Sequence, residues 1–224
     1  MLFLSWLGSG FAEVILGLVA LIMAVLVAIP FHEFAHAYAA KLEGDYTATA
    51  CKRCTLNGLA HMDFAGFLLM ALFGFGWAKP VPIDERNFKR GNRSKFIVSI
   101  AGILMNLLLG TAFLFIYMII YRFFPEFYVS SLYGYLLQMF LEFSFFLNFG
   151  LAIFNILPIY PLDGYNIIAS FSKTENGFLR FMKQFSFVFF AIIIFTNLYD
   201  IYYNVVIGAI FDVLVKFFSF ILGF

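Results

Sequence analysis

The sequence predicts an all-α polytopic membrane protein with about five transmembrane helices and one membrane-associated loop region. Of its 224 residues, 63% are hydrophobic and only 12% are charged, and the mean hydropathy is +0.95. A soluble domain carries about a quarter charged residues, and a chain of this size could not bury so much apolar surface in one core. The composition therefore excludes a cytosolic globular protein, a disordered chain and a disulfide-built secreted module.

The net charge and the first ten residues argue against two further features, a nucleic-acid partner and a cleavable signal peptide. The net charge of +1 argues against a nucleic-acid partner, because nucleic-acid binding needs a basic face. The first ten residues lack the basic start of a cleavable signal peptide, so none is expected. We expect residues 1–224 to form a single transmembrane domain, with a motif-bearing core at about 11–170 and a C-terminal helical hairpin at about 181–223.

The predicted spans follow from the apolar runs. A spanning helix needs about 20 mostly apolar residues, and five segments meet this requirement, namely roughly 11–40, 96–122, 133–157, 181–199 and 201–223. A sixth apolar run at 64–77 is too short to span and is interrupted by glycines. We expect a re-entrant or β-like loop there, with its backbone satisfied by protein or water.

The basic residues predict the orientation of the spans. Nine of the fourteen lysines and arginines lie in segment 41–95. Because positively charged loops stay on the cytoplasmic side, this segment is predicted to be cytoplasmic and the N-terminus outside. Five spans would then place the C-terminus inside. The predicted location is the cell membrane, with the lipid bilayer as the surrounding solvent.

The first span contains the HExxH pattern His32-Glu33-Phe34-Ala35-His36. Positions i and i+4 share one face of a helix, so both imidazoles can reach one metal ion. Glu33 points about 100° away, which lets it take a proton from an activated water without being a ligand. The flanking residues are apolar, so a solvated helix face does not explain these ionisable groups. This is the strongest indication of zinc hydrolysis in the chain.

A catalytic zinc needs three protein ligands, and Asp163 is the best candidate for the third. It follows Pro158 and Pro161 at the cytoplasmic end of the third span. Asp163 could instead cap a helix that begins near Tyr165. We favour metal ligation because the HExxH motif lies at a similar depth near the cytoplasmic end of its own span.

Further motifs follow the HExxH in a fixed order between about residues 30 and 170. They are Thr55-Leu56-Asn57, Ala60-His61-Met62-Asp63, Gly74-Phe75-Gly76-Trp77-Ala78-Lys79-Pro80-Val81, Ala101-Gly102 with Asn106, Asn155-Ile156-Leu157-Pro158 and Pro161-Leu162-Asp163-Gly164. In this combination the sequence resembles the site-2 protease family of intramembrane zinc metalloproteases, in its compact subgroup without PDZ or CBS domains. It departs from that subgroup at Gly58, Ala65 and Ile103, where prolines are usual.

The resemblance implies an activity and a division of roles. His32, His36 and Asp163 would bind one Zn²⁺ per chain. Glu33 would activate the water, and Asn155 would hold the substrate backbone or the oxyanion. The implied reaction is hydrolysis of peptide bonds in or next to transmembrane segments of membrane proteins, as in regulated intramembrane proteolysis. The implied partner is a transmembrane protein or peptide substrate.

Two polar residues are candidates for supporting the metal ligands. His61 lies in the loop after the first span and Asn106 in the second span. Either residue could order the metal site from behind its ligands or simply satisfy a structural hydrogen bond. The pair Cys51 and Cys54 forms a CxxC, but a structural zinc needs two further ligands, so we expect solvent-side thiols.

Two other functions would fit part of the pattern. An intramembrane metal-ion transporter would explain His32, His36 and Asp163 but gives no reason for Glu33. A catalytically inactive homologue that binds membrane proteins would keep the fold. It is disfavoured because every predicted ligand and the base are present in the sequence.

Overall fold

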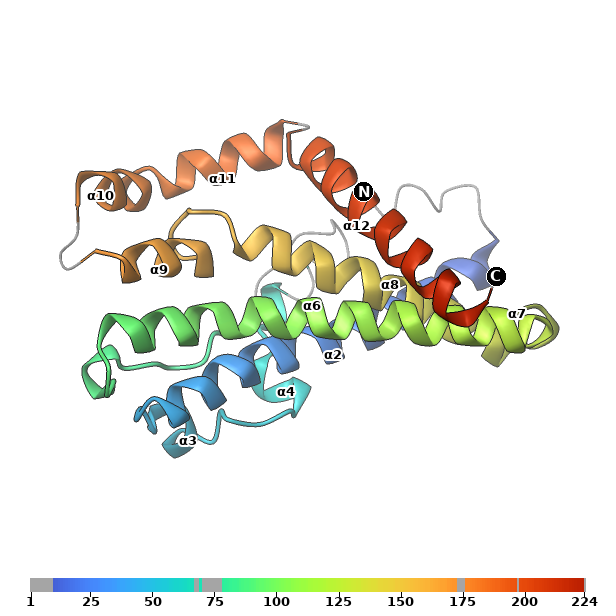
Figure 1. Ribbon diagram of the computed structural model, residues 1–224, viewed down its shortest axis with the longest axis horizontal. Coiled ribbons are helices and arrows are strands. Elements are labelled where there is room, and N and C mark those ends of the chain that lie inside the picture. The colour runs from blue at the N-terminus through green and yellow to red at the C-terminus, as the bar shows by residue number, and fades with distance from the viewer. Residues whose placement is uncertain (1–9, 67–68, 70–77, 173–175, 197, 224) are drawn as a thin grey trace.

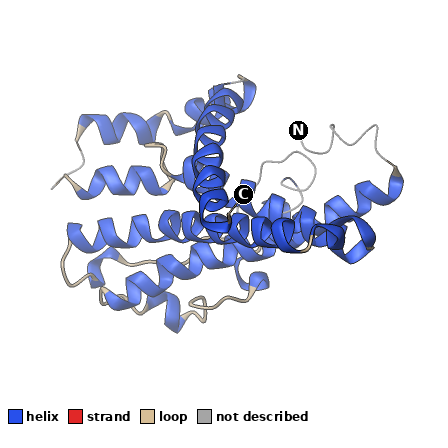
Figure 2. Cartoon of the chain, turned by 45° about the vertical axis from the view of Figure 1, so that its right-hand side comes forward, coloured by secondary structure: helices blue, strands red, loops and turns tan. Residues whose placement is uncertain are grey.

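The described part of the chain is helical, as the sequence predicts. The computed structural model describes residues 10–66, 69, 78–172, 176–196 and 198–223, and it has no β-strand among them (Figure 2). Most of the predicted re-entrant segment, residues 67–68 and 70–77, lies outside the described residues. The prediction of an all-α polytopic fold is confirmed.

Within the described residues, four helices are long and apolar enough to cross a membrane. They are α2 (Phe11–Leu42), α6 (Asn92–Phe123), α8 (Leu132–Asn155) and α12 (Leu198–Leu222), the last over Tyr202–Leu222. At 1.5 Å per residue, α2 and α6 are each about 48 Å long, so they exceed the hydrocarbon thickness of about 30 Å and must tilt or protrude. Helices α2, α6 and α8 pack against one another and form the centre of the bundle (Figure 1).

Short helices connect the long ones. Between α2 and α6 the chain forms α3 (Thr47–Ala50), α4 (Gly58–His61) and the 3-10 helix η1 (Glu85–Asn87). Helix α7 (Pro125–Ser130) joins α6 to α8. Helices α9 (Asp163–Ser170), α10 (Gly177–Gln184) and α11 (Ser186–Phe195) lead from α8 to α12.

Small side chains allow α2 to pack closely in the bundle. Ala20, Ala24 and Ala28 recur every four residues on one face of the helix and are fully buried. Residues of this size let helix backbones approach each other within a bilayer. Beside them, Leu21 and Val25 pack against Phe143 and Leu147 of α8. This interface fixes the position of α2, and therefore of the HExxH motif that it carries.

The segment at 181–199 differs from the expected fourth span. It folds as the end of α10 and all of α11, which are separated at Phe185. Helix α10 carries Arg180 and Lys183, whose charges favour an aqueous or interfacial position. Helix α11 is only 10 residues, or about 15 Å, long. The described residues therefore contain four spanning helices where about five were expected, and α12 lacks an antiparallel spanning partner in α11.

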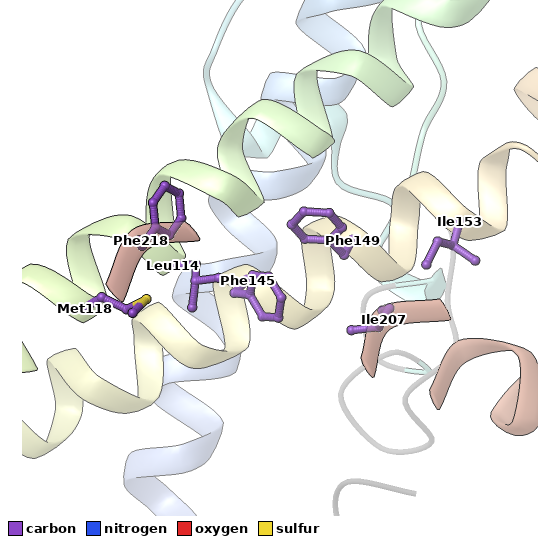
Figure 3. Close-up of a cluster of buried hydrophobic side chains, with 7 residues drawn as sticks. All are labelled: Leu114, Met118, Phe145, Phe149, Ile153, Ile207 and Phe218. Carbon is purple, nitrogen blue, oxygen red and sulfur yellow. The ribbon is translucent and has the colours of Figure 1, made fainter. Parts of the chain in front are cut away.

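Helix α12 leads from the end of α8 towards the end of α6. Ile207 packs with Ile153 near the end of α8, whereas Phe218 lies against Phe115 of α6 with ring centroids 4.9 Å apart. Figure 3 shows this cluster, which also includes Leu114, Met118, Phe145 and Phe149. Helix α12 therefore runs in the same general direction as α6 but crosses it obliquely (Figure 1). Its last turn lies at the same end of the bundle as α7 (Figure 1).

Candidate metal centre

Three metal-ligating side chains converge between α2 and α9. His32 and His36 project from one face of α2, and their Nε2 atoms lie 3.0 Å apart. Oδ2 of Asp163 lies 3.4 Å from Nε2 of His32 and 3.2 Å from Nε2 of His36. Two nitrogens that each lie 2.0–2.1 Å from a tetrahedral zinc are about 3.3 Å apart. The three atoms therefore have the mutual spacing of ligands to one ion.

Hydrogen bonds to α6 orient both imidazole rings. Nδ1 of His36 donates to the carbonyl of Val98 at 2.7 Å, and Nδ1 of His32 donates to Oδ1 of Asn106, also at 2.7 Å. With the protons on Nδ1, each Nε2 presents a lone pair towards the other. Two lone pairs at 3.0 Å repel each other unless a cation lies between them. The donor set therefore fits a metal ion, and the buried Oδ2 of Asp163 has no hydrogen-bond partner in the described part of the chain.

Gly102 leaves the space that the two histidines occupy. A Cβ at this position would lie 2.3 Å from Nε2 of His36 and 2.6 Å from Cε1 of His32. Val98, Gly102 and Asn106 are spaced by four residues, so they share one face of α6. The sequence showed Gly102 only as part of a motif, whereas Asn106 was also a candidate for supporting the ligands. The contribution of Val98 comes from its backbone and has no signature in the sequence.

The backbone of Val81 fixes the glutamate of the motif. Glu33 is 9% exposed, and its Oε2 accepts a hydrogen bond from the N–H of Val81 at 2.8 Å. Val81 lies outside any helix, between Pro80 and Pro82, which have no backbone N–H to offer. Glu33 is thereby held beside the histidines in a fixed orientation, with its other carboxylate oxygen left for chemistry.

The turn between α8 and α9 explains how Asp163 reaches the histidines. A Cβ on Gly164 would lie 2.1 Å from the carbonyl oxygen of Ile156, so the start of α9 packs directly on the end of α8. Asp163 is the first residue of α9, and the N-cap is Leu162, which makes no side-chain capping bond. The alternative expectation of Asp163 as the N-cap of a helix beginning near Tyr165 does not match this geometry.

The other predicted polar residues have different neighbours. Asn106 contacts His32 through the hydrogen bond to its Nδ1. His61 is fully buried, and its Nε2 lies 2.8 Å from the carbonyl of Thr55, so it orders its own loop. Asn155 is the last residue of α8, and its Nδ2 donates to the carbonyl of Leu151 at 3.0 Å. The structure thus brings Asn106 to the ligands but gives His61 and Asn155 local hydrogen bonds.

Buried carboxylates hold the 78–94 segment against the end of α2. The Glu43 carboxylate accepts hydrogen bonds from Arg90 and from Ser94, and these bonds lower the pKa of Glu43 below its usual value. Asp45 is fully buried and accepts the N–H of Asp84 at 2.8 Å. These contacts join the end of α2 to the chain on both sides of η1. They anchor the segment that carries Val81.

A helical membrane bundle that holds an HExxH pair, a convergent aspartate and a buried glutamate has the architecture of a membrane metalloprotease. The chain belongs to peptidase family M50, the site-2 protease family, because the model of Peptidase family M50 matches residues 20–196. It is also similar to "Putative zinc metalloprotease YwhC" of Bacillus subtilis (strain 168), with 37% identity over 175 residues, 74% of this chain and 79% of that protein. No solved structure matches the chain. The resemblance expected from the motifs is confirmed.

Proposed function

We propose that the protein is an intramembrane zinc metalloprotease of the site-2 type, which hydrolyses peptide bonds in or next to transmembrane segments of membrane proteins. The observation that carries this proposal is the convergence of His32, His36 and Asp163, whose ligand atoms lie 3.0–3.4 Å apart inside the bundle. Membership of family M50 supports a protease. The position of the site within a spanning helix supports substrates that enter from the membrane.

One Zn²⁺ per chain would be held by His32, His36 and Asp163. Two neutral imidazoles and one carboxylate form a typical catalytic zinc set, which leaves a fourth position open. When bound, zinc supplies Lewis acidity, which polarises a peptide carbonyl and lowers the pKa of water. The hydrogen bonds from the histidines to Val98 and Asn106 would keep both Nε2 atoms available as ligands.

Glu33 would act as the general base and then as the general acid. Its carboxylate would take a proton from the attacking water and pass it to the leaving amine. The Val81 N–H holds one carboxylate oxygen, so the second is available for the proton. The carboxylate is nearly buried, which limits competition from bulk water.

Asn155 is proposed to stabilise the developing oxyanion. Its amide would have to exchange the bond to Leu151 for one to the substrate carbonyl. We expect Asn155→Ala to keep its zinc and its fold while losing about a hundredfold in turnover, the usual scale for one oxyanion donor. Zinc content, thermal stability and cleavage rate of the purified variant test this. Wild-type cleavage would exclude the catalytic role, and loss of zinc would make Asn155 structural.

The site is proposed to open towards the cytoplasm. His36 lies six residues before the end of α2 at Leu42, or about 9 Å along the helix axis. Segment 41–95, which begins at that end of α2, carries nine of the fourteen basic residues, which supports a cytoplasmic position, with the N-terminus outside. Single cysteines near Lys89 and near Glu126, in a chain without Cys51 and Cys54, should be labelled from opposite sides. Labelling of both from outside would refute this orientation.

The function itself is tested by comparing membrane proteomes of cells that express the wild type or Glu33→Gln. Truncated forms of one or a few membrane proteins should appear only with the wild type, because glutamine cannot accept the proton. Identical proteomes would count against a protease. Metal uptake that is the same in both strains and exceeds that of cells without the protein would instead indicate a transporter.

A further inference from the structure

We infer that Arg53 is a positioning residue for Glu33: by holding the backbone carbonyls of Lys79 and Pro80, it keeps the N–H of Val81 against the Glu33 carboxylate. This inference rests on the proposed function, in which Glu33 is the general base. It concerns a residue that contacts the 78–84 stretch and that the sequence did not single out.

The contacts form a short, continuous path. Nη2 of Arg53 donates to the carbonyl of Lys79 at 2.6 Å and lies 3.4 Å from the carbonyl of Pro80. The next amide along the chain is that of Val81, which donates to Oε2 of Glu33 at 2.8 Å. Only the backbone of three residues therefore separates the guanidinium from the general base.

Apart from the hydrogen bond between Asp84 and Asp45 at its far end, the 78–84 stretch has few other ties, so the bonds from Arg53 matter for the position of Val81. The N–H of Lys79 donates to the carbonyl of His61 at 2.9 Å, and the prolines at 80 and 82 have no N–H to donate. Lys79 and Pro80 are exposed. In the part of the chain that the structure describes, no donor other than Arg53 is bonded to their two carbonyls.

The turn after α3 fixes the position of Arg53. The N–H of Arg53 donates to the carbonyl of Ala48 at 2.8 Å, and the N–H of Lys52 donates to that of Thr49 at 3.0 Å. With Lys52 at φ +55°, these two bonds form a Schellman motif, which ends the helix in one defined geometry. Cys54 then packs with Val81 and Ala48, so the turn and the 78–84 stretch form one unit.

Loss of the hydrogen bonds from Arg53 should change the orientation of the Glu33 carboxylate. A general base works only within hydrogen-bond reach of the proton that it removes. If the 79–81 backbone moves, the Val81 N–H no longer limits rotation of the carboxylate, and fewer bound substrates meet a correctly placed base. The zinc ligands keep their own hydrogen bonds to α6, so zinc binding should not change.

The experiment compares wild type, Arg53→Ala and Arg53→Lys, with Arg93→Ala as a matched control, since Arg93 is exposed on the same side of the bundle. Hydrogen–deuterium exchange of the peptide covering residues 78–84 includes the Val81 amide, and the two prolines leave few other amides in it. Zinc content and steady-state cleavage of fluorescein-labelled casein by the detergent-solubilised protein complete the set.

We expect Arg53→Ala to exchange faster at Val81, to keep its zinc, and to lose about tenfold in kcat, part of the 10²- to 10⁴-fold that a general base supplies. KM should stay within about twofold, because substrate binding is not touched. Arg53→Lys should be intermediate, since an ammonium lacks the planar fork. Arg93→Ala should match the wild type in all three measurements.

Unchanged exchange at Val81 in Arg53→Ala would overturn the inference, as would a kcat equal to that of the Arg93→Ala control. If Arg53→Ala does not fold, Arg53→Lys decides the question by the same exchange measurement. Failure of the proposed function looks different, because wild type and Glu33→Gln would then both leave casein intact. In that case the exchange data alone test whether Arg53 positions the Val81 N–H.

Discussion

Purified Glu33→Gln should retain about one zinc per chain and lose about a thousandfold in turnover. Glutamine has the same shape as glutamate, and its carbonyl can still accept the Val81 N–H that holds Glu33 at 2.8 Å. It cannot take up a proton, so the variant loses general base catalysis, which contributes about 10²–10⁴. Elemental analysis of the metal, together with cleavage of labelled casein, measures both quantities on one sample.

His36→Ala is the complementary variant, because it removes a proposed zinc ligand and leaves Glu33 in place. It removes a ligand atom that lies 3.0 Å from Nε2 of His32 and 3.2 Å from Oδ2 of Asp163, so zinc and turnover should fall together. Activity in Glu33→Gln close to that of the wild type would contradict the assignment of Glu33 as the base. Unchanged zinc in His36→Ala would contradict the site.

Side-chain chemistry at fixed helical spacing made the convergence of the three candidate ligands predictable from sequence. His32 and His36 share a face in any helix, whatever surrounds it, and Asp163 could be matched to them by depth. The groups that hold these residues in place were harder to predict from the sequence. The Val98 carbonyl and the Val81 N–H are backbone groups, which almost any residue at these positions would supply. Their roles depend on how α6 and the 78–84 stretch pack against α2, which no local pattern encodes.

Hydropathy predicted four of the spans well but counted one too many. The 181–199 segment is apolar over most of its length, so its summed hydropathy predicts a helix that crosses the membrane. The structure instead breaks it at Phe185 and again at Thr196, where the backbone becomes extended. No proline or glycine marks either break in the sequence. The predicted side of the C-terminus depends on this count, because each span added or removed reverses it.

Gly102→Ala should abolish zinc binding although it adds only one methyl group. The new Cβ would lie 2.3 Å from Nε2 of His36 and 2.6 Å from Cε1 of His32, closer than any van der Waals contact. The rings cannot simply swing away, because bonds of 2.7 Å to Val98 and Asn106 pin their Nδ1 atoms. Either these bonds break or α6 moves outwards, and both changes separate the ligands. Zinc per chain should fall from about one to near zero, with turnover lost alongside it.

The same substitution at Gly208 separates this effect from helix stability. Gly208 lies on α12, where an added Cβ would have nothing within 4 Å, so Gly208→Ala should keep its zinc. Alanine is the better helix former by about 1 kcal/mol, which means that α6 itself should not be weakened by Gly102→Ala. A loss of zinc without a loss of helix content is therefore expected at position 102 alone. Full zinc occupancy in Gly102→Ala would show that the histidines have room to move. It would contradict the view that close packing of α6 against the histidines orients the site.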